Sequence, residues 1–377
     1  MDSQLLPEGF RDSLPMVAKK EYILNSKFVE LMFSSGFSIV KPPLAEFENS
    51  LFFLNKSSKN TESFRVLDPI SQKMMGLRND ITLQIARISC GSLKDYPRPL
   101  RLIYSGEILR VKNNSLNLSR QFTQIGGEII GIKKLSLESE IIEILINILR
   151  SFKINNYFVS FNMPTLIGTL CDDFKFSESQ RNLIIKKYKN KNVGDLNKIS
   201  NKLEEISIFL FSCVGDARHN LNKIKKYQFP SNTQKEIDNF LKIMNKLLKL
   251  FPKAKILIDP LEIDESEYHN GLAFKVYSAN FKELFSGGTY NVADENCVGF
   301  SGLLDNLVLE SKISDSSRKK ICTPSNISNK DMKLLFKKGF MVIRTEIDDK
   351  KKEILAYAKE NKCPYVFYKN NILKVKR

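Results

Sequence analysis

The segment FTQIGGEII, residues 122–130, carries polar side chains at a spacing that suits the binding of a small molecule. Side chains alternate between the two faces of a strand, so Gln124, Gly126 and Glu128 share one face. At about 3.3 Å per residue, Gln124 and Glu128 stand about 13 Å apart, and Gly126 leaves bare backbone between them. This pattern predicts a cradle for a small, polar, cationic group. The alternative is a half-buried strand with two solvated polar residues and a bulge.

Three further segments carry side chains that could reach the same pocket. Asp80 and Thr82 lie in LRNDITLQIAR, where a strand turns into a helix and backbone N–H groups are free. Arg110 lies in the strand that we expect to pair with residues 122–130, and Tyr268 precedes another strand in EYHNGLAFKVYS. Each has a structural alternative: helix capping for Asp80 and Thr82, and a core position for Tyr268.

Taken together, these side chains supply the groups that are needed to bind a free amino acid. The carboxylates and the glutamine could hold an ammonium or imidazole group, and Arg110 could hold the α-carboxylate. The alternative role of Arg110 is a cross-strand ion pair with Glu128 or Glu107. No nucleophile–base pair stands out, and the sequence has no phosphate-binding GxxxxGK[ST] loop. The predicted ligand residues are Asp80, Thr82, Arg110, Gln124, Glu128 and Tyr268.

Hydrophobic periodicity indicates the elements that must position these residues. We expect helices near 15–36, 80–89 and 135–152, and a long hairpin of strands 102–111 and 122–130. Residues 165–250 are predicted to be helical and are rich in lysine. Residues 254–258, 272–277 and 281–285 are predicted strands of an antiparallel sheet, followed by a glycine turn at SGGTYN. After about residue 315, strands and helices alternate, which is typical of a small α/β module.

The composition is that of an ordinary globular protein of 377 residues. No apolar run approaches a membrane span and the N-terminus has no secretory signal pattern. The six cysteines include no CxxC pair, and with two histidines a zinc site is improbable. We therefore expect free thiols in a reducing cytoplasm, no cofactor and no membrane partner.

The net charge of +17 is concentrated in two segments, residues 181–256 and 311–377, each with a net charge of +11. The remainder of the chain carries −5. Lysines on solvated helix faces and a surface facing a polyanion both explain this distribution, and the sequence leaves them open.

Several motifs resemble a known family when they are read in order. LPEGFRD, LRNDITLQIAR, the hairpin RLIYSGEILR…SRQFTQIGGEIIG, SGGTYN and CVGFSGLLDNL resemble the histidyl-tRNA synthetase catalytic domain. They are most similar to its non-aminoacylating relative, the regulatory subunit of ATP phosphoribosyltransferase. The resemblance covers about residues 1–165 and 254–310, with a weaker match over the C-terminal module.

The resemblance implies an α+β fold: a class II aminoacyl-tRNA synthetase-like antiparallel sheet flanked by helices, dimerising through its first motif. It implies a core over residues 1–310, with a helical insert at about 165–253, and a small C-terminal α/β module over 311–377. In the synthetase, the positions matching Asp80, Thr82, Arg110, Gln124 and Glu128 hold histidine.

Departures from the synthetase pattern fall on its catalytic groups. The arginine of the synthetase RGLDYY motif is Asp264 here, and the ATP-binding arginine of the third motif is Asn306. Lys112 replaces the glutamate of the FRxE motif, and Thr289 replaces the arginine of GGRYD. Losing one group that stabilises developing charge costs about 10²–10³ in rate, so Arg120, which is retained, does not restore adenylation.

The sequence therefore predicts a non-catalytic regulatory subunit of ATP phosphoribosyltransferase, which supports the first step of histidine biosynthesis and binds histidine as an effector. Its expected partners are the short-form catalytic subunit and a second copy of itself, and nucleic acid is not expected. The alternatives are an active histidine–tRNA ligase and a tRNA-binding module that uses the two basic segments.

Overall fold

The computed structural model of the chain describes residues 5–51, 63–111, 119–132, 138–192, 194–263, 269–313 and 318–375. The chain divides into two compact units, Met1–Ile313 and Ser314–Arg377, which we call the core unit and the C-terminal unit. Each is described by itself.

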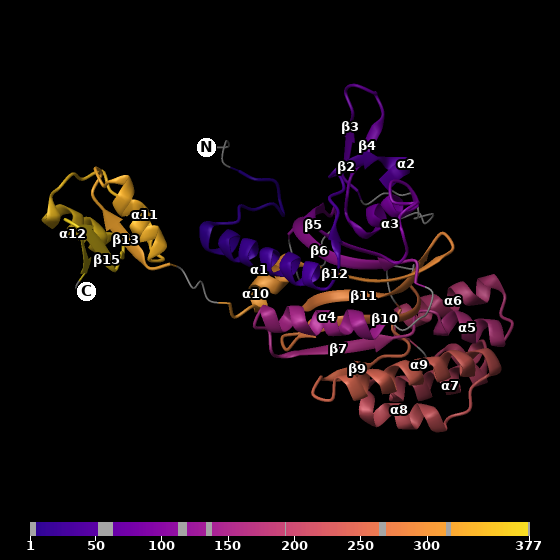
Figure 1. Cartoon of the computed structure of the whole chain (residues 1–377). Helices are drawn as coiled ribbons and strands as arrows, with labels where there is room; N and C mark the ends of the chain where they lie inside the picture. The colour runs from indigo at the N-terminus through magenta and orange to yellow at the C-terminus, as the bar shows by residue number, and fades with distance from the viewer. Residues whose placement is uncertain are drawn as a thin grey trace. The chain divides into compact units, whose positions relative to one another are not determined.

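A nine-stranded sheet runs through the described residues of the core unit (Figure 1). In order across the sheet, its strands are β1 (Ser38–Ile39), β5 (Leu100–Leu109), β6 (Gln121–Ile130), β12 (Glu295–Leu303), β11 (Glu283–Val292), β10 (His269–Ser278), β7 (Tyr157–Asn162), β9 (Ile256–Ile258) and β8 (Gly215–Asp216).

The middle of this sheet is antiparallel, from β5 through β6, β12, β11 and β10 to β7. Two pairs toward the edges are parallel: β1 with β5, and β7 with β9. The prediction that residues 254–258 belong to an antiparallel arrangement is thus wrong for the pairing of β9 with β7. The helical segment between these two strands is long enough to return the chain to the start of a parallel strand, which a short hairpin loop cannot do.

One face of β6 packs into the main hydrophobic core of the core unit. Ile125 and Ile129 point to this face and belong to its buried cluster. The same cluster includes Leu24 of α1 (Pro15–Ser34) and Leu145 of α4 (Glu138–Ser151). Helices α1 and α4 therefore cover this side of the strand.

The opposite face of β6 carries the polar pair. Phe122 and Ile130 point to this face and pack in a second buried cluster with Ile85 of α3 (Thr82–Cys90). Gln124 and Glu128 share the face because side chains alternate along the strand. The strand thus presents its polar pair on the side where α3 lies.

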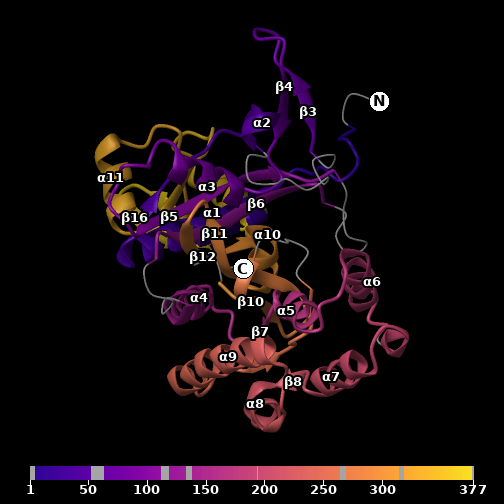
Figure 2. The same ribbon diagram turned by 90° about the vertical axis from the view of Figure 1, so that its right-hand side faces the viewer.

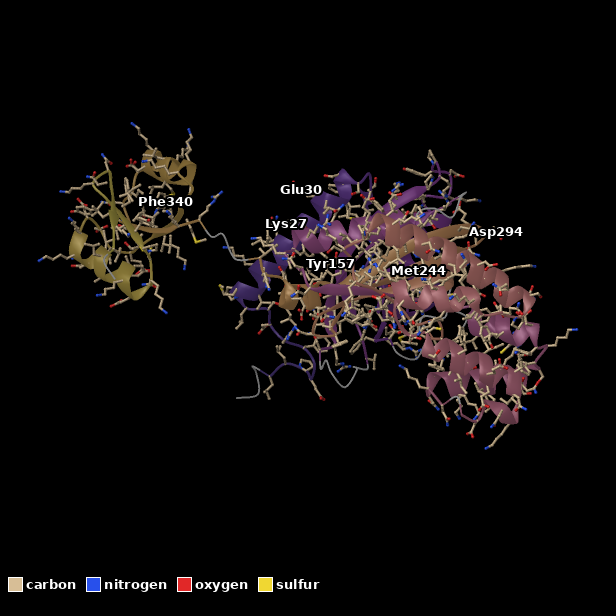
Figure 3. All side chains as sticks on the ribbon, turned by 90° about the horizontal axis from the view of Figure 1, so that it is seen from below. Lys27, Glu30, Tyr157, Met244, Asp294 and Phe340 are labelled. Carbon is tan, nitrogen blue, oxygen red and sulfur yellow. The ribbon has the colours of Figure 1, made fainter. Side chains whose placement is uncertain are left out.

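The helical insert follows β7 and gathers beside the edge strands of the sheet, as Figure 2 shows. Its buried apolar side chains continue the main core, and Met244, labelled in Figure 3, is fully buried among them. Its helices are α5 (Leu166–Asp173), α6 (Glu178–Lys189), the 3₁₀ helix η3 (Leu196–Lys198), α7 (Asn201–Ser212), α8 (Ala217–Lys226) and α9 (Ser231–Leu250).

A second, three-stranded sheet leads the chain into α3. Its strands lie in the order β2 (Ala45–Phe47), β4 (Met74–Leu77) and β3 (Arg65–Leu67), and the short helix α2 (Glu48–Leu51) follows β2. Arg78, directly after β4, is 6% exposed and donates to the carbonyl oxygens of Glu107 and Pro42. These bonds fix the chain immediately before Asp80.

The predicted glycine turn at SGGTYN is wrong, because these residues lie inside β11. Gly288 pairs with Ala273 on one side and with Gly299 on the other, and the helix α10 (Leu304–Glu310) begins after β12. A side chain at Gly288 would overlap the neighbouring backbone and the ring of His269. The glycine therefore allows close approach within a sheet, which in sequence looks the same as a turn.

The C-terminal unit is a small α/β module, and its parallel strands β14 (Met341–Arg344), β13 (Lys320–Thr323) and β15 (Tyr365–Tyr368) match the predicted alternation. The sequence pattern missed the last strand, β16 (Asn371–Lys374), which forms a hairpin with β15. Phe340, labelled in Figure 3, packs edge to face against Tyr365. The helices are α11 (Asn329–Lys337) and α12 (Lys351–Glu360).

Candidate functional site

A cavity of about 390 Å³ lies on the face of the large sheet that carries Gln124 and Glu128. Five of the six predicted ligand residues line it; Tyr268, the sixth, lies outside the described residues, as do Asp264 and Lys112. The five come from the start of α3, the end of β5 and the middle of β6: Asp80, Thr82, Arg110, Gln124 and Glu128.

Gln124 and Asp80 together hold the first turn of α3. Gln124 Oε1 accepts a hydrogen bond from the backbone N–H of Ile81 at 2.8 Å, and Gln124 Nε2 donates to Asp80 Oδ1 at 3.1 Å. Asp80 Oδ1 also accepts from the backbone N–H of Thr82 at 2.8 Å. Asp80 therefore satisfies one backbone N–H at the start of α3 while lining the cavity, although the N-cap position itself is Ile81, which has no side-chain cap.

The space above Gly126 is filled, so the prediction of a bare floor at this residue is wrong. Tyr104 lies directly opposite Gly126 on β5, and a β-carbon at Gly126 would overlap the Tyr104 phenol. The Tyr104 hydroxyl lies 3.0 Å from Thr82 Oγ1. An aromatic side chain that covers a cross-strand glycine cannot be inferred from β6 alone. The open floor lies instead on neighbouring strands, at Ser286 and Ser301.

Glu128 is the most deeply buried titratable group of the cavity, at 1% exposure. Its Oε2 accepts a 2.6 Å hydrogen bond from the Tyr290 hydroxyl, and Tyr104 donates to its Oε1 at 3.5 Å. A β-carbon at Gly299 would overlap this carboxylate, so the glycine provides its space. Burial raises the pKa of Glu128 to about 8, although the bonds from Tyr290 and Tyr104 oppose the rise. The cavity thus holds an acid that is mostly protonated at neutral pH until a cationic group arrives.

Arg110 follows the last residue of β5 and is exposed. Its guanidinium lies over the Phe122 ring, 5.6 Å from the centroid. The alternative ion pair with Glu107 or Glu128 does not form; Glu107 instead accepts hydrogen bonds from Thr123 at 2.7 Å and Gln121 at 3.2 Å. Arg110 is therefore a cation at the rim of the cavity.

The sequence analysis did not predict several residues of the cavity wall, among them Tyr290, Lys275 and Glu283. Tyr290 was not predicted because its segment, SGGTYN, has a sequence pattern typical of a turn. Lys275 had a usable signal, since it is a single charge between the apolar neighbours of the strand LAFKVY. It forms a 2.7 Å ion pair with Glu262.

The positions that differ from the synthetase pattern contribute no cation to the described part of the cavity wall. Asn306 donates to the backbone carbonyl of Glu283 at 2.9 Å. Thr289 is buried, and its hydroxyl donates to the carbonyl of Leu272 at 3.5 Å. The retained Arg120 places its guanidinium over two aromatic rings, those of Phe64, 4.6 Å from the centroid, and Phe10.

Comparison with known proteins identifies the family. A sequence model of histidyl-tRNA synthetase matches residues 9–307. The ATP phosphoribosyltransferase regulatory subunit of Rhodospirillum rubrum is 31% identical over 344 residues, which cover 90% of this chain and 89% of the relative. The chain belongs to the ATP phosphoribosyltransferase regulatory subunits, within the histidyl-tRNA synthetase family. The regulatory subunit of Rhodospirillum centenum is 30% identical over 81% of this chain and 80% of its own.

Comparison with solved structures shows that this member of the regulatory-subunit family has the same fold as the synthetases. An ATP phosphoribosyltransferase regulatory subunit/histidyl-tRNA synthetase from Bacillus halodurans C superposes with a TM-score of 0.80 at 20% identity, over 94% of this chain and 97% of that one. Histidyl-tRNA synthetase from Nostoc sp. PCC 7120 gives a TM-score of 0.78 at 18% identity, over 97% and 91%. The predicted class II synthetase-like α+β fold is confirmed. Among the described helices, none has the length and apolar character needed to cross a membrane.

Proposed function

We propose that this chain is a non-catalytic regulatory subunit of ATP phosphoribosyltransferase that binds free histidine in the cavity described above. The observation that carries the proposal is the buried acid Glu128, held by Tyr290 inside a cavity that also contains Asp80. A buried carboxyl group with a raised pKa, to which no described residue offers an ion pair, is suited to a cationic ligand.

Histidine fits this arrangement group by group. Its imidazole lies against Glu128 and Tyr290, where proton exchange with the carboxyl group gives a charge-assisted hydrogen bond. Its ammonium group lies near Asp80 and the Thr82 hydroxyl at the start of α3. Its α-carboxylate lies toward the basic side of the cavity, where Arg110 stands at the rim.

The absence of catalysis is supported by the groups that replace the synthetase cations. Adenylation develops negative charge on phosphate, and preorganised cations stabilise it. Asp264, Thr289 and Asn306 occupy the corresponding sequence positions. The relatives are themselves named regulatory subunits.

In this proposal the partners are a short-form catalytic subunit and a second copy of the chain. Histidine regulates the complex by binding one of its states more tightly than another, because a ligand shifts an equilibrium only through differential affinity. The expected consequence is feedback on the first step of histidine biosynthesis.

Calorimetric titration with L-histidine tests the binding site. We expect saturable binding by the unchanged chain and a loss of affinity of about 10-fold or more in Glu128→Gln, because a charge-assisted bond is replaced by a neutral one. Glu30→Gln is the matched control, since Glu30 is exposed on α1 (Figure 3). No heat with millimolar histidine, with or without the catalytic subunit, contradicts the proposal. Histidine-dependent exchange of pyrophosphate into ATP would show a ligase instead.

A further inference from the structure

The wall of the cavity also carries a charged side chain at some distance from Glu128. Lys275 lines it, with a side chain that is 23% exposed. Its ammonium group donates to Glu262 Oε1 at 2.7 Å, and the Glu262 backbone carbonyl accepts from Asn162 Nδ2 at 3.1 Å. Lys275 is therefore anchored to the sheet, and an ammonium group has three donors, of which Glu262 takes one.

Strand register leads from Lys275 across small residues toward the centre of the cavity. Lys275 pairs with Ser286, Ser286 with Ser301, and Ser301 with Gly126. Directly opposite residues in adjacent strands point to the same face, so Lys275 and the two serines share the cavity face. The serines are too short to fill the space between Lys275 and the Tyr104 ring that covers Gly126.

The acidic and basic sides are separated by a distance that suits one amino acid. The Glu128 carboxylate lies over Gly299, which is in register with Ala273, two strands away on β10. Lys275 follows Ala273 by two residues along β10. With strands about 4.8 Å apart and residues about 3.3 Å apart, the Cα atoms of Gly299 and Lys275 are about 12 Å apart. The ammonium group of Lys275 is held within this region by its 2.7 Å bond to Glu262.

Two other charged side chains of the cavity wall lie on the same side as Lys275 and affect whether it can bind a carboxylate. Arg110 is exposed and stacked on Phe122, so its position is set at the rim. Glu283 also lines the cavity. Burial raises the pKa of Glu283, while Lys275 and Arg110 act to lower it. Lys275 thus lines the cavity as a cation whose position is fixed by its ion pair with Glu262.

We infer that Lys275, positioned by Glu262, recognises the carboxylate of the ligand and makes this pocket selective for a free α-amino acid over its decarboxylated or alcohol analogue. This inference rests on the proposed function, because it assumes that histidine occupies the cavity. It assigns carboxylate recognition to the anchored lysine, and Arg110 contributes only at the rim.

Competing titrations of the full chain with L-histidine and L-histidinol, in which an alcohol replaces the carboxylate, test this assignment. We expect the unchanged chain to prefer histidine by about 10-fold or more, the range of a hydrogen bond to a charged group. Lys275→Met should weaken histidine binding by that factor and leave histidinol binding within about 3-fold. Lys275→Arg should restore part of the preference. Lys27→Met is the control, because Lys27 is exposed on α1.

Removal of Lys275 leaves Glu262 without this ion pair, so the double variant Lys275→Met with Glu262→Gln separates the lost charge from a misfolded site. We expect it to bind histidinol as the unchanged chain does and to show no preference for histidine. Equal weakening of both ligands, an unchanged preference in Lys275→Met, or loss of the preference in Arg110→Met instead overturns the inference. Absence of histidine binding by the unchanged chain refutes the proposed function itself.

Discussion

At the scale of single residues, Glu128 shows how a fold can hold a carboxyl group in an unfavourable environment. The carboxyl group is buried, and the hydroxyls of Tyr290 and Tyr104 offer it hydrogen bonds. These bonds only partly replace water, so its pKa is raised. Holding the acid in place therefore costs stability, and a cation that enters the cavity recovers part of that loss.

This burial predicts an unusual pH dependence of folding. The pKa of Glu128 is about 8 in the folded chain against an ordinary value of 4.5, so between these values the folded state holds a proton that the unfolded state has released. The contribution of Glu128 to stability is therefore present below pH 4.5 and is lost as the pH rises toward 8, by up to about 1.4 kcal/mol per pH unit. Urea unfolding followed by circular dichroism from about pH 5 to pH 8.5 measures this slope.

The variant Glu128→Gln cannot titrate, so its stability relative to the unchanged chain should rise with pH across this window. Glu30→Gln, an exposed position, should run parallel to the unchanged chain. Parallel curves for Glu128→Gln and the unchanged chain would show that Glu128 is ionised throughout, and would remove the reason to expect a cationic ligand beside it.

At the scale of elements, β6 and α3 form one unit joined by Gln124. Its side chain is 2% exposed and satisfies the N–H of Ile81, a residue at the start of a helix that has no side-chain cap of its own. The same amide orients Asp80. The strand thereby positions a carboxylate that belongs to another element.

Gln124→Met should loosen the first turn of α3, because it keeps the side-chain volume and removes both hydrogen bonds. A buried donor left without a partner costs about 1–3 kcal/mol. Hydrogen exchange at residues 81–85 should accelerate, and the thermal unfolding midpoint should fall. Gln121→Met, on an exposed residue of the same strand, is the control. Equal exchange in the two variants would mean that Gln124 does not hold the helix.

Much at this scale could be predicted from the sequence, and the failures share a cause. Periodicity and turn signals located the hairpin of β5 and β6 and the start of α3. The neighbours across the strands could not be predicted from the sequence. They are Tyr104 over Gly126, Gly299 beneath Glu128, and Lys275 on β10. Their places depend on register, which a single strand sequence does not specify. The resemblance pointed to five positions that line the cavity because the family pattern already contains that register.

At the scale of the whole molecule, the cavity and the C-terminal unit are separate parts of the chain. Every residue that lines the cavity belongs to the core unit, in the part of the chain that the structure describes. The C-terminal unit has its own buried clusters, one of which contains Cys322 and Val366. The positive charge of this unit therefore does not come from residues of the described cavity wall.

If the chain binds histidine as proposed, a chain that ends at Ile313 should keep that affinity within about 2-fold, because every described residue that lines the cavity belongs to the core unit and independent parts contribute additively. The end of the core is tied down: the Ser311 hydroxyl donates to the carbonyl of Phe152 at 2.7 Å, and the backbone N–H of Ile313 donates to Ser311 Oγ at 3.1 Å. Calorimetry of the shortened chain, beside its circular dichroism spectrum, makes the measurement. A folded core that no longer binds histidine would show that the C-terminal unit completes the site.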